Sequence, residues 1–232
     1  MLKMFIKEDY KIMDTYIWSN PKYTNLKSVP TKYSFNSGVT MLIGPNGSGK
    51  STTLSQLNSI FNKDNSSHKW EDIEQNKEIS SEYSCFYYDN KYEEKFTKDS
   101  WLHDEGNIKN IAEAFGNSEG QDIFNFLTKK VPQIGKAVTN AKKENCKGIL
   151  ILLDGLDSGL SLDILNYLRT SLLDFIINID NTETFEIYII CSANSYEFCN
   201  NYDCINIINQ QHIKFTNYEE FSNYFETNYK YK

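Results

Sequence analysis

Residues 44–52 read Gly-Pro-Asn-Gly-Ser-Gly-Lys-Ser-Thr, and this stretch decides the fold of the chain. It fills the pattern G-x-x-x-x-G-K-[ST]. An apolar run at residues 39–43 precedes it, and apolar residues at helical spacing, beginning with Leu54 and Leu57, follow it. A strand, a glycine-rich turn and a helix in this order form the context in which such a pattern binds phosphate. The sequence therefore predicts a Walker A loop at residues 44–52.

Each residue type in this loop has a physical reason to be there. Glycines allow backbone N–H groups to curl around phosphate oxygens, and the start of the following helix adds N–H groups and a positive dipole end. Lys50 is expected to place its charge on the β- and γ-phosphates, and Ser51 to offer its hydroxyl to Mg²⁺. The expected nucleotide-binding residues of the loop are Gly44, Pro45, Asn46, Gly47, Ser48, Gly49, Lys50, Ser51 and Thr52.

The composition narrows the class of protein. The 232 residues are enough to bury a core, and a formal charge of −7 argues against a chain built mainly to coat nucleic acid. Arg169 is the only arginine, which disfavours ring ATPases with an arginine finger and small-molecule kinases that clamp phosphates with several arginines. The Asn-Lys-Asp at residues 62–64 lacks the second acid that the base-reading motif of a GTPase requires.

Cysteine usage and hydropathy indicate the compartment. The five cysteines are scattered, without a C-x-x-C pair or histidines at zinc spacing, as is usual for free thiols in a reducing environment. The N-terminus is charged from Lys3 onward, and the longest apolar run, at residues 149–153, is far too short to span a bilayer. We expect a cytoplasmic protein with no membrane insertion.

An apolar run that ends in an acid lies far downstream of the loop. Asp154 closes the strand predicted at residues 148–153. In this position an aspartate orients Mg²⁺ and its water, which is the role of a Walker B residue. Ser51 and Asp154 are therefore the predicted metal-binding residues.

Apolar runs and breakers predict strands that alternate with helices. The predicted strands lie at residues 33–40 continuing to 43, 82–88, 148–153 and 185–191, with a hairpin at 204–208 and 212–215. The predicted helices follow the loop and occupy residues 121–143, with a kink or break at Pro132, and residues 162–177. A capping box at Thr216 and Glu219 is expected to open a short last helix, and the polar residues 62–80 predict an exposed loop.

This alternation predicts an α/β fold: a P-loop NTPase with a mostly parallel β-sheet flanked by helices. We expect one ATP-binding domain spanning residues 1–232. Residues 62–148, between Walker A and Walker B, would form a reduced helical insertion, and residues 204–232 a C-terminal hairpin and helix.

The start of the long predicted helix is open to two interpretations. Residues 117–121 read Asn-Ser-Glu-Gly-Gln. A small, glycine-containing helix start can hold an anion on its free N–H groups. Ser118 can equally well be an ordinary N-cap, and taken alone the segment favours the N-cap.

The order and spacing of these motifs resemble the ABC-type ATPase family. Walker A is followed by Ser-x-Gly-Gln at residues 118–121, a strand ending in Asp154, Asp-Ser-Gly-Leu at residues 157–160 and a further buried strand. The resemblance covers residues 39–194. It implies a homodimer with ATP at the interface, in which Ser118, Gly120 and the adjoining Gln121 reach the γ-phosphate bound by the partner.

The length of the chain restricts the branch of the family. Only 68 residues separate Lys50 from Ser118, which leaves no room for the coiled-coil arms of chromosome-maintenance proteins. The same interval is short for the helical subdomain with which a transporter grips its membrane partner. The chain is therefore most similar to small stand-alone ABC-like ATPases of bacterial or phage type.

The sequence departs from the family pattern where catalysis would occur. The family's glutamate after the Walker B aspartate is Gly155 here, and its switch histidine is Asn194, which cannot become a cation. Asp157 is a candidate to stand in as the base, so the expected catalytic residues are Asp154, Asp157 and Asn194. If Gly155 is the vacant position of the base, Gly155→Glu is expected to raise hydrolysis.

The family's glutamine loop has no clear counterpart. It would follow the strand predicted at residues 82–88, where the chain has only Asp89 and Asn90. Neither residue is assigned a role from the sequence.

We expect an ATP-binding protein that hydrolyses ATP to ADP and phosphate at a low rate, with ATP and Mg²⁺ bound. The alternative from another class is an ATP-dependent dimerisation switch without hydrolysis; Gly155 and Asn194 favour it, whereas Asp154 and Asp157 favour hydrolysis. An unidentified protein or DNA partner is possible. DNA could contact lysines of the long helix, although a solvated helix face is the simpler explanation for them; they are Lys129, Lys130, Lys142 and Lys143.

Overall fold

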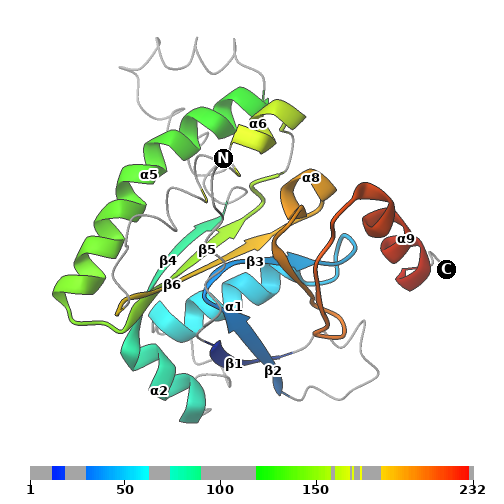
Figure 1. Ribbon diagram of the computed structural model, residues 1–232. Helices are drawn as coiled ribbons and strands as arrows, with labels where there is room; N and C mark the ends of the chain where they lie inside the picture. The colour runs from blue at the N-terminus through cyan, green and yellow to red at the C-terminus, as the bar shows by residue number, and fades with distance from the viewer. Residues whose placement is uncertain are drawn as a thin grey trace, which may run out of the picture.

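The computed structural model describes residues 12–18, 30–62, 74–89, 119–157, 160–167, 169, 173 and 184–229. Within these ranges a six-stranded sheet forms the centre, and a separate two-stranded sheet accompanies it (Figure 1). The strands are β1 (Ile12–Trp18), β2 (Pro30–Asn36), β3 (Gly38–Ile43), β4 (Tyr83–Asp89), β5 (Gly148–Asp154), β6 (Glu186–Ser192), β7 (Asp203–Asn206) and β8 (His212–Ile213). The helices are α1 (Lys50–Asn62), α2 (Glu74–Glu82), α5 (Glu119–Lys143), α6 (Leu162–Tyr167), α8 (Tyr196–Cys199) and α9 (Tyr218–Asn228).

The large sheet has the strand order β4-β5-β6-β3-β7-β8. Neighbouring strands from β4 to β7 are parallel, and β8 runs antiparallel to β7. The parallel strands therefore end at one common edge, with β6 between β3 and β5. The α/β class and the mostly parallel sheet flanked by helices are confirmed, and this arrangement is compatible with a P-loop fold.

Both faces of the sheet are covered, so the central strands have no polar face. On one face, Ile151 of β5 belongs to a buried cluster with Ile134 of α5. On the other face, Leu152 of β5 belongs to a second cluster with Leu54 of α1 and Tyr33 of β2. Successive side chains of a strand point to opposite faces, and burial of both faces explains why β5 and β6 read as continuous apolar runs.

The first strand of the sequence prediction is divided in two. β2 ends at Asn36 and β3 begins at Gly38, whose φ of 100° turns the chain between them. β2 pairs with β1 in the small antiparallel sheet, whereas β3 enters the large sheet. Hydrophobic alternation continues across this turn, which is why the sequence suggested one strand.

Two local predictions are wrong because tertiary packing outweighs local signals. Residues 74–80 do not form a loop, since they make up most of α2, where Asn76 is buried and Ile79 packs against the core. α5 continues through Pro132 without the predicted break. The buried residues that follow Pro132, including Ile134 and Val138, stabilise the helix beyond its local propensity. α6 forms the first part of the helix predicted at residues 162–177, and most of residues 168–177 lie outside the described residues.

The C-terminal hairpin is confirmed, with a displaced cap on the helix that follows. β7 and β8 pair antiparallel. The N-cap of α9 is Asn217, whose side chain accepts the N–H of Glu220 at 2.9 Å. The Glu220 carboxylate in turn accepts the N–H of Thr216 at 2.9 Å. The helix start is therefore capped, but the cap lies one residue later than the predicted pair Thr216 and Glu219, and Glu220 reaches back to the residue before the N-cap.

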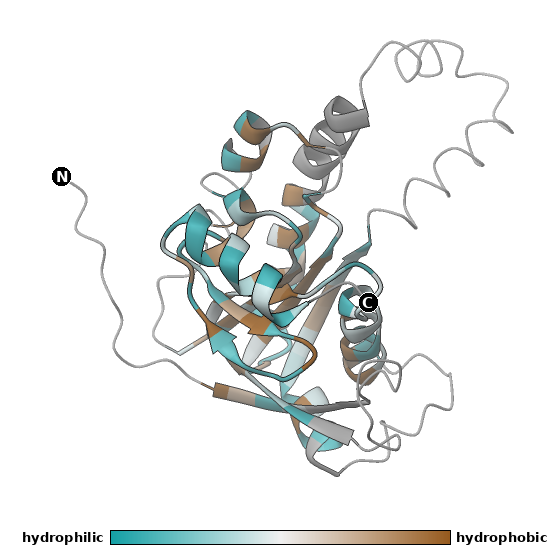
Figure 2. Cartoon of the chain, turned by 90° about the vertical axis from the view of Figure 1, so that its right-hand side faces the viewer, coloured by the Kyte–Doolittle hydropathy of each residue, from teal (hydrophilic) through white to brown (hydrophobic). Residues whose placement is uncertain are grey.

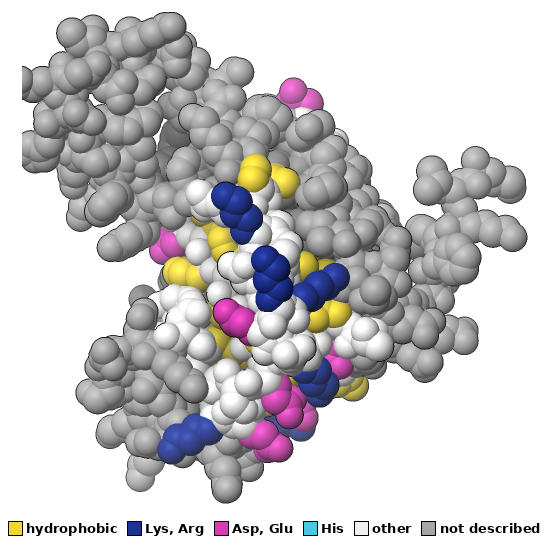
Figure 3. Space-filling view, turned by 90° about the vertical axis from the view of Figure 1, so that its left-hand side faces the viewer, with side chains coloured by type: hydrophobic (Ala, Val, Ile, Leu, Met, Phe, Trp, Pro, Cys, Tyr) yellow, Lys and Arg dark blue, Asp and Glu magenta, His cyan; other side chains and the backbone are white. Residues whose placement is uncertain are grey.

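The surface is mixed in polarity and charge. The helices carry both hydrophilic and hydrophobic segments, as expected for elements with one face on a core and one in solvent (Figure 2). On the face drawn in Figure 3, lysine and acidic side chains are interspersed. Among the described residues, no helix is both long enough and apolar enough to cross a membrane.

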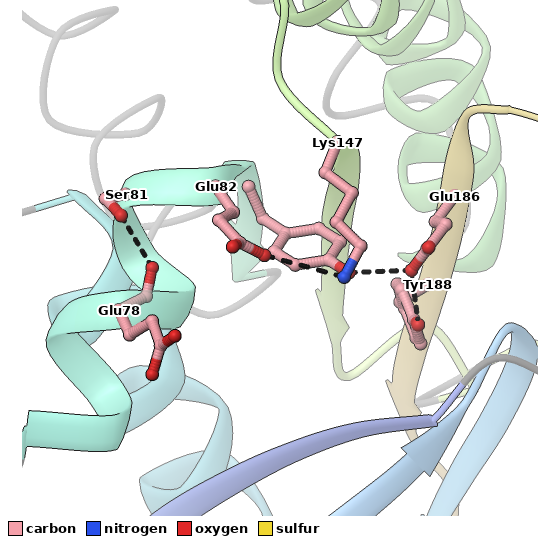
Figure 4. A network of polar contacts seen from close by, with 7 residues as sticks. Glu78, Ser81, Glu82, Lys147, Glu186 and Tyr188 are labelled. Atoms are coloured by element: carbon pink, nitrogen blue, oxygen red, sulfur yellow. Dashed lines mark hydrogen bonds and ion pairs between the residues drawn. The ribbon is translucent and has the colours of Figure 1, made fainter.

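A buried carboxylate connects β4 and β6 near the amino ends of these strands (Figure 4). Glu186, which is 6 % exposed, accepts hydrogen bonds from the hydroxyls of Tyr83 at 2.6 Å and Tyr188 at 2.8 Å. Burial, and then the hydrogen bond to Glu186, raises the pKa of both tyrosines well above its ordinary value. Both hydroxyls therefore stay protonated and able to donate. Lys147 and Glu82 form a looser, more exposed ion pair at 3.5 Å beside this network.

The first residue of β5 must be glycine for β5 and β6 to lie this close. A Cβ at Gly148 would lie 2.2 Å from the backbone oxygen of Glu186. We predict that Gly148→Ala lowers the free energy of unfolding by about 1–3 kcal/mol, because the two strands must separate to admit the methyl group. Urea denaturation measures this change.

Gly135 provides the matched control for this substitution. A Cβ at this position in α5 meets nothing within 4 Å. Gly135→Ala is expected to be neutral or to stabilise the protein by roughly 0.5–1 kcal/mol, since alanine is the better helix former. Equal destabilisation by both substitutions would contradict the close approach of β5 and β6.

Candidate functional site

A cavity of about 460 Å³ opens at the edge of the sheet where the parallel strands end. The carboxyl ends of β4, β5 and β6, the loop after β3 and the start of α1 contribute to its wall. Ligands of open α/β sheets bind outside the carboxyl ends of the strands. The cavity is lined by Asn46, Gly47, Gly49, Lys50, Ser51, Thr52, Asp89, Asp154, Gly155, Ser192 and Asn194.

The loop between β3 and α1 is tightly folded. Gly47 and Gly49 have φ angles of 76° and 106°, which residues with a side chain rarely adopt. The N–H of Ser48 donates to the carbonyl oxygen of Pro45 at 3.1 Å. The ammonium of Lys50, a residue only 7 % exposed, donates to the carbonyl oxygen of Gly44 at 2.6 Å. A positive charge is thus held inside the turn that this loop forms.

The first turn of α1 completes this side of the cavity. Ser51 and Thr52 are exposed and line it, while Leu54 and Leu57 are buried and hold the helix on the sheet. The first N–H groups of a helix have no partner within the helix, and they lie at the positive end of its dipole. This part of the cavity is therefore suited to bind an anion.

Asp154 faces the loop from the end of β5. It is 3 % exposed, and its Oδ1 accepts a hydrogen bond from the hydroxyl of Ser192 at 2.5 Å. The Ser192 oxygen in turn accepts the N–H of Gly155 at 2.9 Å. Because β6 is the neighbour of β5, the end of one strand fixes the orientation of the carboxylate at the end of the other.

A second carboxylate lies beside Asp154. Asp89 and Asp154 are paired residues in the ladder between β4 and β5, and both line the cavity. The hydroxyl of Tyr87 donates to Oδ2 of Asp89 at 3.3 Å. Burial, and then the negative charges of Asp89 and Asp154, raises the pKa of Tyr87, so this hydroxyl remains a donor. Two acids therefore converge opposite one buried lysine.

Asp157 lies behind the cavity wall and holds Asn194 in place. Its carboxylate accepts the backbone N–H of Asn194, the side-chain amide of Asn194 at 3.0 Å and the N–H of Ser195 at 3.0 Å. Asp157 is 8 % exposed, whereas Asn194 is exposed and lines the cavity. Both Asp157 oxygens are thus committed to the loop that follows β6.

Part of the predicted site lies outside the described residues. Ser118 is not among them, and neither are residues 158 and 159 of the Asp-Ser-Gly-Leu segment. Gly120 and Gln121 belong to the first turn of α5, where only the backbone is described. The described residues therefore include the glycine-rich loop and the strand ends. The role of residues 118–121 that the family resemblance implies stays a prediction.

Two residues of the cavity were not assigned a role from the sequence. Asp89 and Ser192 are the last residues of β4 and β6, as Asp154 is of β5. A polar residue that closes an apolar strand was the signal that identified Asp154. The same signal is present at the other two positions, but only the strand order places them beside the loop.

The donor set of the cavity fits Mg²⁺. Within the described ranges, no group of three or more His, Cys, Asp or Glu is arranged to hold a metal. Mg²⁺ does not need such a cage, because it keeps several waters and binds one or two carboxylates together with substrate phosphates. Asp154 and the hydroxyl of Ser51 line the same cavity and could supply those protein oxygens, and Asp89 lies beside them.

The chain was compared with models of protein families, with curated proteins and with solved structures, and none of the three comparisons finds a match.

The backbone of Gly155 limits what can replace it. Its φ is 71°, in the left-handed region where most residues with a side chain lose about 1–2 kcal/mol. The expected gain of hydrolysis in Gly155→Glu therefore meets a structural obstacle, since a glutamate would have to strain or move the turn after β5.

We predict that Gly155→Glu lowers the free energy of unfolding by about 1–2 kcal/mol and that Gly155→Asn has a smaller effect. Asparagine tolerates the left-handed region better than other residues with a side chain. Thermal and urea denaturation of both variants measure the difference. Equal stability of the two variants would show that the conformation at residue 155 does not constrain the side chain.

Proposed function

We propose that this chain binds a nucleoside triphosphate, with ATP the expected ligand, and hydrolyses it slowly to ADP and phosphate. One observation carries the proposal. The glycine-rich loop, the start of α1 with Lys50 and Ser51, and the carboxylates of Asp89 and Asp154 line a single cavity. A phosphate chain needs converging N–H groups and a cation, and its Mg²⁺ needs carboxylate oxygens.

The cavity has N–H groups and a lysine on one side and carboxylates on the other, and this arrangement favours a triphosphate with its metal ion over a single anion. Residues 46–52 provide N–H groups and the lysine, whereas Asp89 and Asp154 would repel an anion that has no metal ion beside it. A bound Mg²⁺ would neutralise charge on the terminal phosphates, with Asp154 and Ser51 as the residues to hold it. Lys50 would exchange the Gly44 carbonyl for phosphate oxygens when the ligand binds.

Asp89 is the carboxylate best placed to act on the attacking water. Gly155 has no side chain, and Asp157 is engaged by Asn194 and Ser195. In the proposed reaction a water oxygen attacks the γ-phosphorus, and the bond from that phosphorus to the bridging oxygen of ADP breaks. The Asp89 carboxylate accepts the proton of the water as the new bond forms, which is the work of a general base.

Asn194 is proposed to position the terminal phosphate by hydrogen bonds. Its side-chain amide is oriented by Asp157 at 3.0 Å, which leaves the second amide hydrogen and the carbonyl oxygen for ligands. A neutral amide stabilises developing negative charge less than a cation does. This difference supports slow turnover.

The resemblance to ABC-type ATPases supports a homodimer with ATP between the subunits. In that arrangement residues 118–121 of one subunit would reach the γ-phosphate held by the other. The alternative is a switch that dimerises on ATP without hydrolysing it, and the glycine at position 155 favours that alternative. Measurement of phosphate release from ATP separates the two.

We predict that Lys50→Ala weakens Mg²⁺–ATP binding by about 10- to 150-fold, because a charge-assisted hydrogen bond to phosphate contributes about 1.5–3 kcal/mol. Isothermal titration calorimetry measures the affinity, and a phosphate-release assay measures turnover. Lys136→Ala is the control, since Lys136 is exposed on α5. If the wild-type chain binds no Mg²⁺–ATP, or if Lys50→Ala binds it equally well, the proposed function is wrong.

Asp89→Asn is predicted to reduce phosphate release by about 100-fold while ATP affinity changes little. The amide keeps the shape of the side chain but cannot accept the proton, and general-base catalysis contributes about 10²- to 10⁴-fold. Single-turnover phosphate release, compared with ATP binding by calorimetry, provides the two readouts.

Asp157→Asn distinguishes the two candidate bases. It removes an acceptor from the loop after β6, so we expect lower stability and weaker positioning of Asn194, with turnover reduced less than in Asp89→Asn. Complete loss of turnover in a folded Asp157→Asn protein, with normal turnover in Asp89→Asn, would assign the base to Asp157. Absence of turnover in the wild type, with tight ATP binding, would favour the switch.

A further inference from the structure

A second cavity, of about 440 Å³, adjoins the first at Asn46 and Asn194, which line both. Its other walls come from the start of the glycine-rich loop, from the C-terminal half of α9, drawn in red in Figure 1, and from the residue after that helix. The second cavity is lined by Gly44, Pro45, Asn46, Asn194, Phe225, Glu226 and Tyr229. Because Asn194 is proposed to position the terminal phosphate, this cavity opens beside that end of a bound triphosphate.

The terminal phosphate would face neutral groups on the side of the second cavity. Lys50 and the residues proposed to bind Mg²⁺, Ser51 and Asp154, line the first cavity and are not among the residues that line the second. The junction itself is formed by Asn46 and Asn194, whose side-chain amides carry no charge. In phosphoryl transfer the negative charge is spread over the equatorial oxygens of the transferred group, and a cation placed beside them accelerates the reaction.

The walls of the second cavity have the chemistry of a site for an organic cation. Among its described lining residues, Glu226 carries the only charge, because burial raises the pKa of Tyr229 and keeps that hydroxyl neutral. The hydroxyl of Ser222 donates to Oε1 of Glu226 at 3.2 Å, and a carboxylate has further lone pairs for a ligand. The aromatic rings of Phe225 and Tyr229 attract a cation to their faces.

The charges around the second cavity favour a cation over other occupants. With ATP bound, the cavity would lie between the terminal phosphate and the carboxylate of Glu226, and these like charges repel each other. An organic cation between them is attracted by both. A metal ion such as Mg²⁺ or Ca²⁺ needs several oxygen ligands, whereas a volume of about 440 Å³ with aromatic walls is usual for a small organic ligand.

The aromatic wall is held in place because α9 is anchored to the sheet. The side-chain amide of Asn206, at the end of β7, donates to the hydroxyl of Tyr224. The ring of Tyr224 also packs against buried Phe215, with centroids 5.6 Å apart. The rings of Phe225 and Tyr229 lie 5.1 Å apart at 54°. The wall beside the loop is thus preorganised to receive a ligand.

We propose that the second cavity binds an organic cation, a guanidinium or alkylammonium group, that contacts the terminal phosphate and the Glu226 carboxylate together. This inference rests on the proposed function, since the phosphates must occupy the first cavity. The bound cation raises the affinity for ATP and speeds hydrolysis, because it supplies the positive charge that the amide of Asn194 lacks. A planar guanidinium suits both anions, since its N–H groups can donate to a carboxylate and to a phosphate.

The test uses methylguanidinium as the probe and methylurea, which has a similar shape and no charge, as its control. Calorimetry measures Mg²⁺–ATP affinity of the full chain and a phosphate-release assay measures turnover, with ionic strength kept constant by sodium chloride. At saturating but non-denaturing concentrations, methylguanidinium is expected to raise turnover by about 10- to 150-fold, the factor of one charge-assisted hydrogen bond. ATP affinity is expected to rise as well, and methylurea to change neither.

Glu226→Gln is expected to remove most of the response to methylguanidinium. Without the probe this variant binds ATP at least as tightly as wild type, because a negative charge near the terminal phosphate is gone. Glu219→Gln is the matched control, since Glu219 is an exposed glutamate at the other end of α9 that does not line the cavity. Phe225→Leu keeps an apolar side chain without a ring and is expected to bind the probe about 2- to 30-fold more weakly. Circular dichroism shows that each variant is folded.

The peptide Gly-Arg-Gly, tested in place of methylguanidinium, distinguishes two sources of the cation. Activation by both ligands supports the site and assigns the cation to an arginine side chain of another protein. Activation by methylguanidinium alone supports the site and assigns it to a small free molecule.

The failures are also distinguishable. If wild type binds Mg²⁺–ATP, Lys50→Ala weakens that binding and methylguanidinium changes neither affinity nor turnover, the cation site is wrong and the proposed function stands. If methylurea acts as strongly as methylguanidinium, or if Glu219→Gln loses the response as fully as Glu226→Gln, the inference is overturned. If wild type binds no Mg²⁺–ATP, the proposed function and the cation site fail together.

Discussion

The common carboxyl edge of the parallel strands is the constraint on which the candidate site depends. Because β3, β5 and β6 are parallel and adjacent in the order β5-β6-β3, the loop after β3 and the ends of the other two strands must meet at one edge. β4 adds a fourth strand end beside β5. This geometry brings Lys50, Asp154, Ser192 and Asp89 into one cavity although they are distant in sequence. The apolar clusters on both faces hold the edge in place and contribute no chemistry to it.

The position of β6 has a specific consequence for the acids. With β6 between the loop strand and β5, the hydroxyl of Ser192 can orient Asp154 and receive the N–H of Gly155. The next residues of the same segment bring Asn194 to the cavity wall, where Asp157 binds it through both carboxylate oxygens. Asp157 is therefore better explained as a residue that positions Asn194 than as a base.

Site residues that depend on local interactions could be predicted from the sequence, whereas those that depend on the pairing of distant strands could not. Residues 44–52 were identified from sequence because a turn of this kind is local: its glycines, its lysine and the adjoining helix start are consecutive. Asp154 was identified because it ends a long apolar run. Asp89 and Ser192 end strands in the same way, but their relevance depends on which strands are neighbours, and the sequence does not state the strand order. The division at Gly38 was missed because hydrophobic alternation continues across the turn, and the helix at residues 74–82 was missed because packing against the core outweighed local composition.

By itself, the sequence determined the alternation of strands and helices, the mostly parallel sheet and the loop that holds Lys50. These features follow from hydrophobic periodicity and from the backbone freedom of glycine, which act over a few residues. Only the tertiary structure decided which strand ends face that loop and that α9 places aromatic rings beside it. Pairing between distant strands and docking of a terminal helix are set by the burial of whole faces, and no short stretch of the chain contains that information.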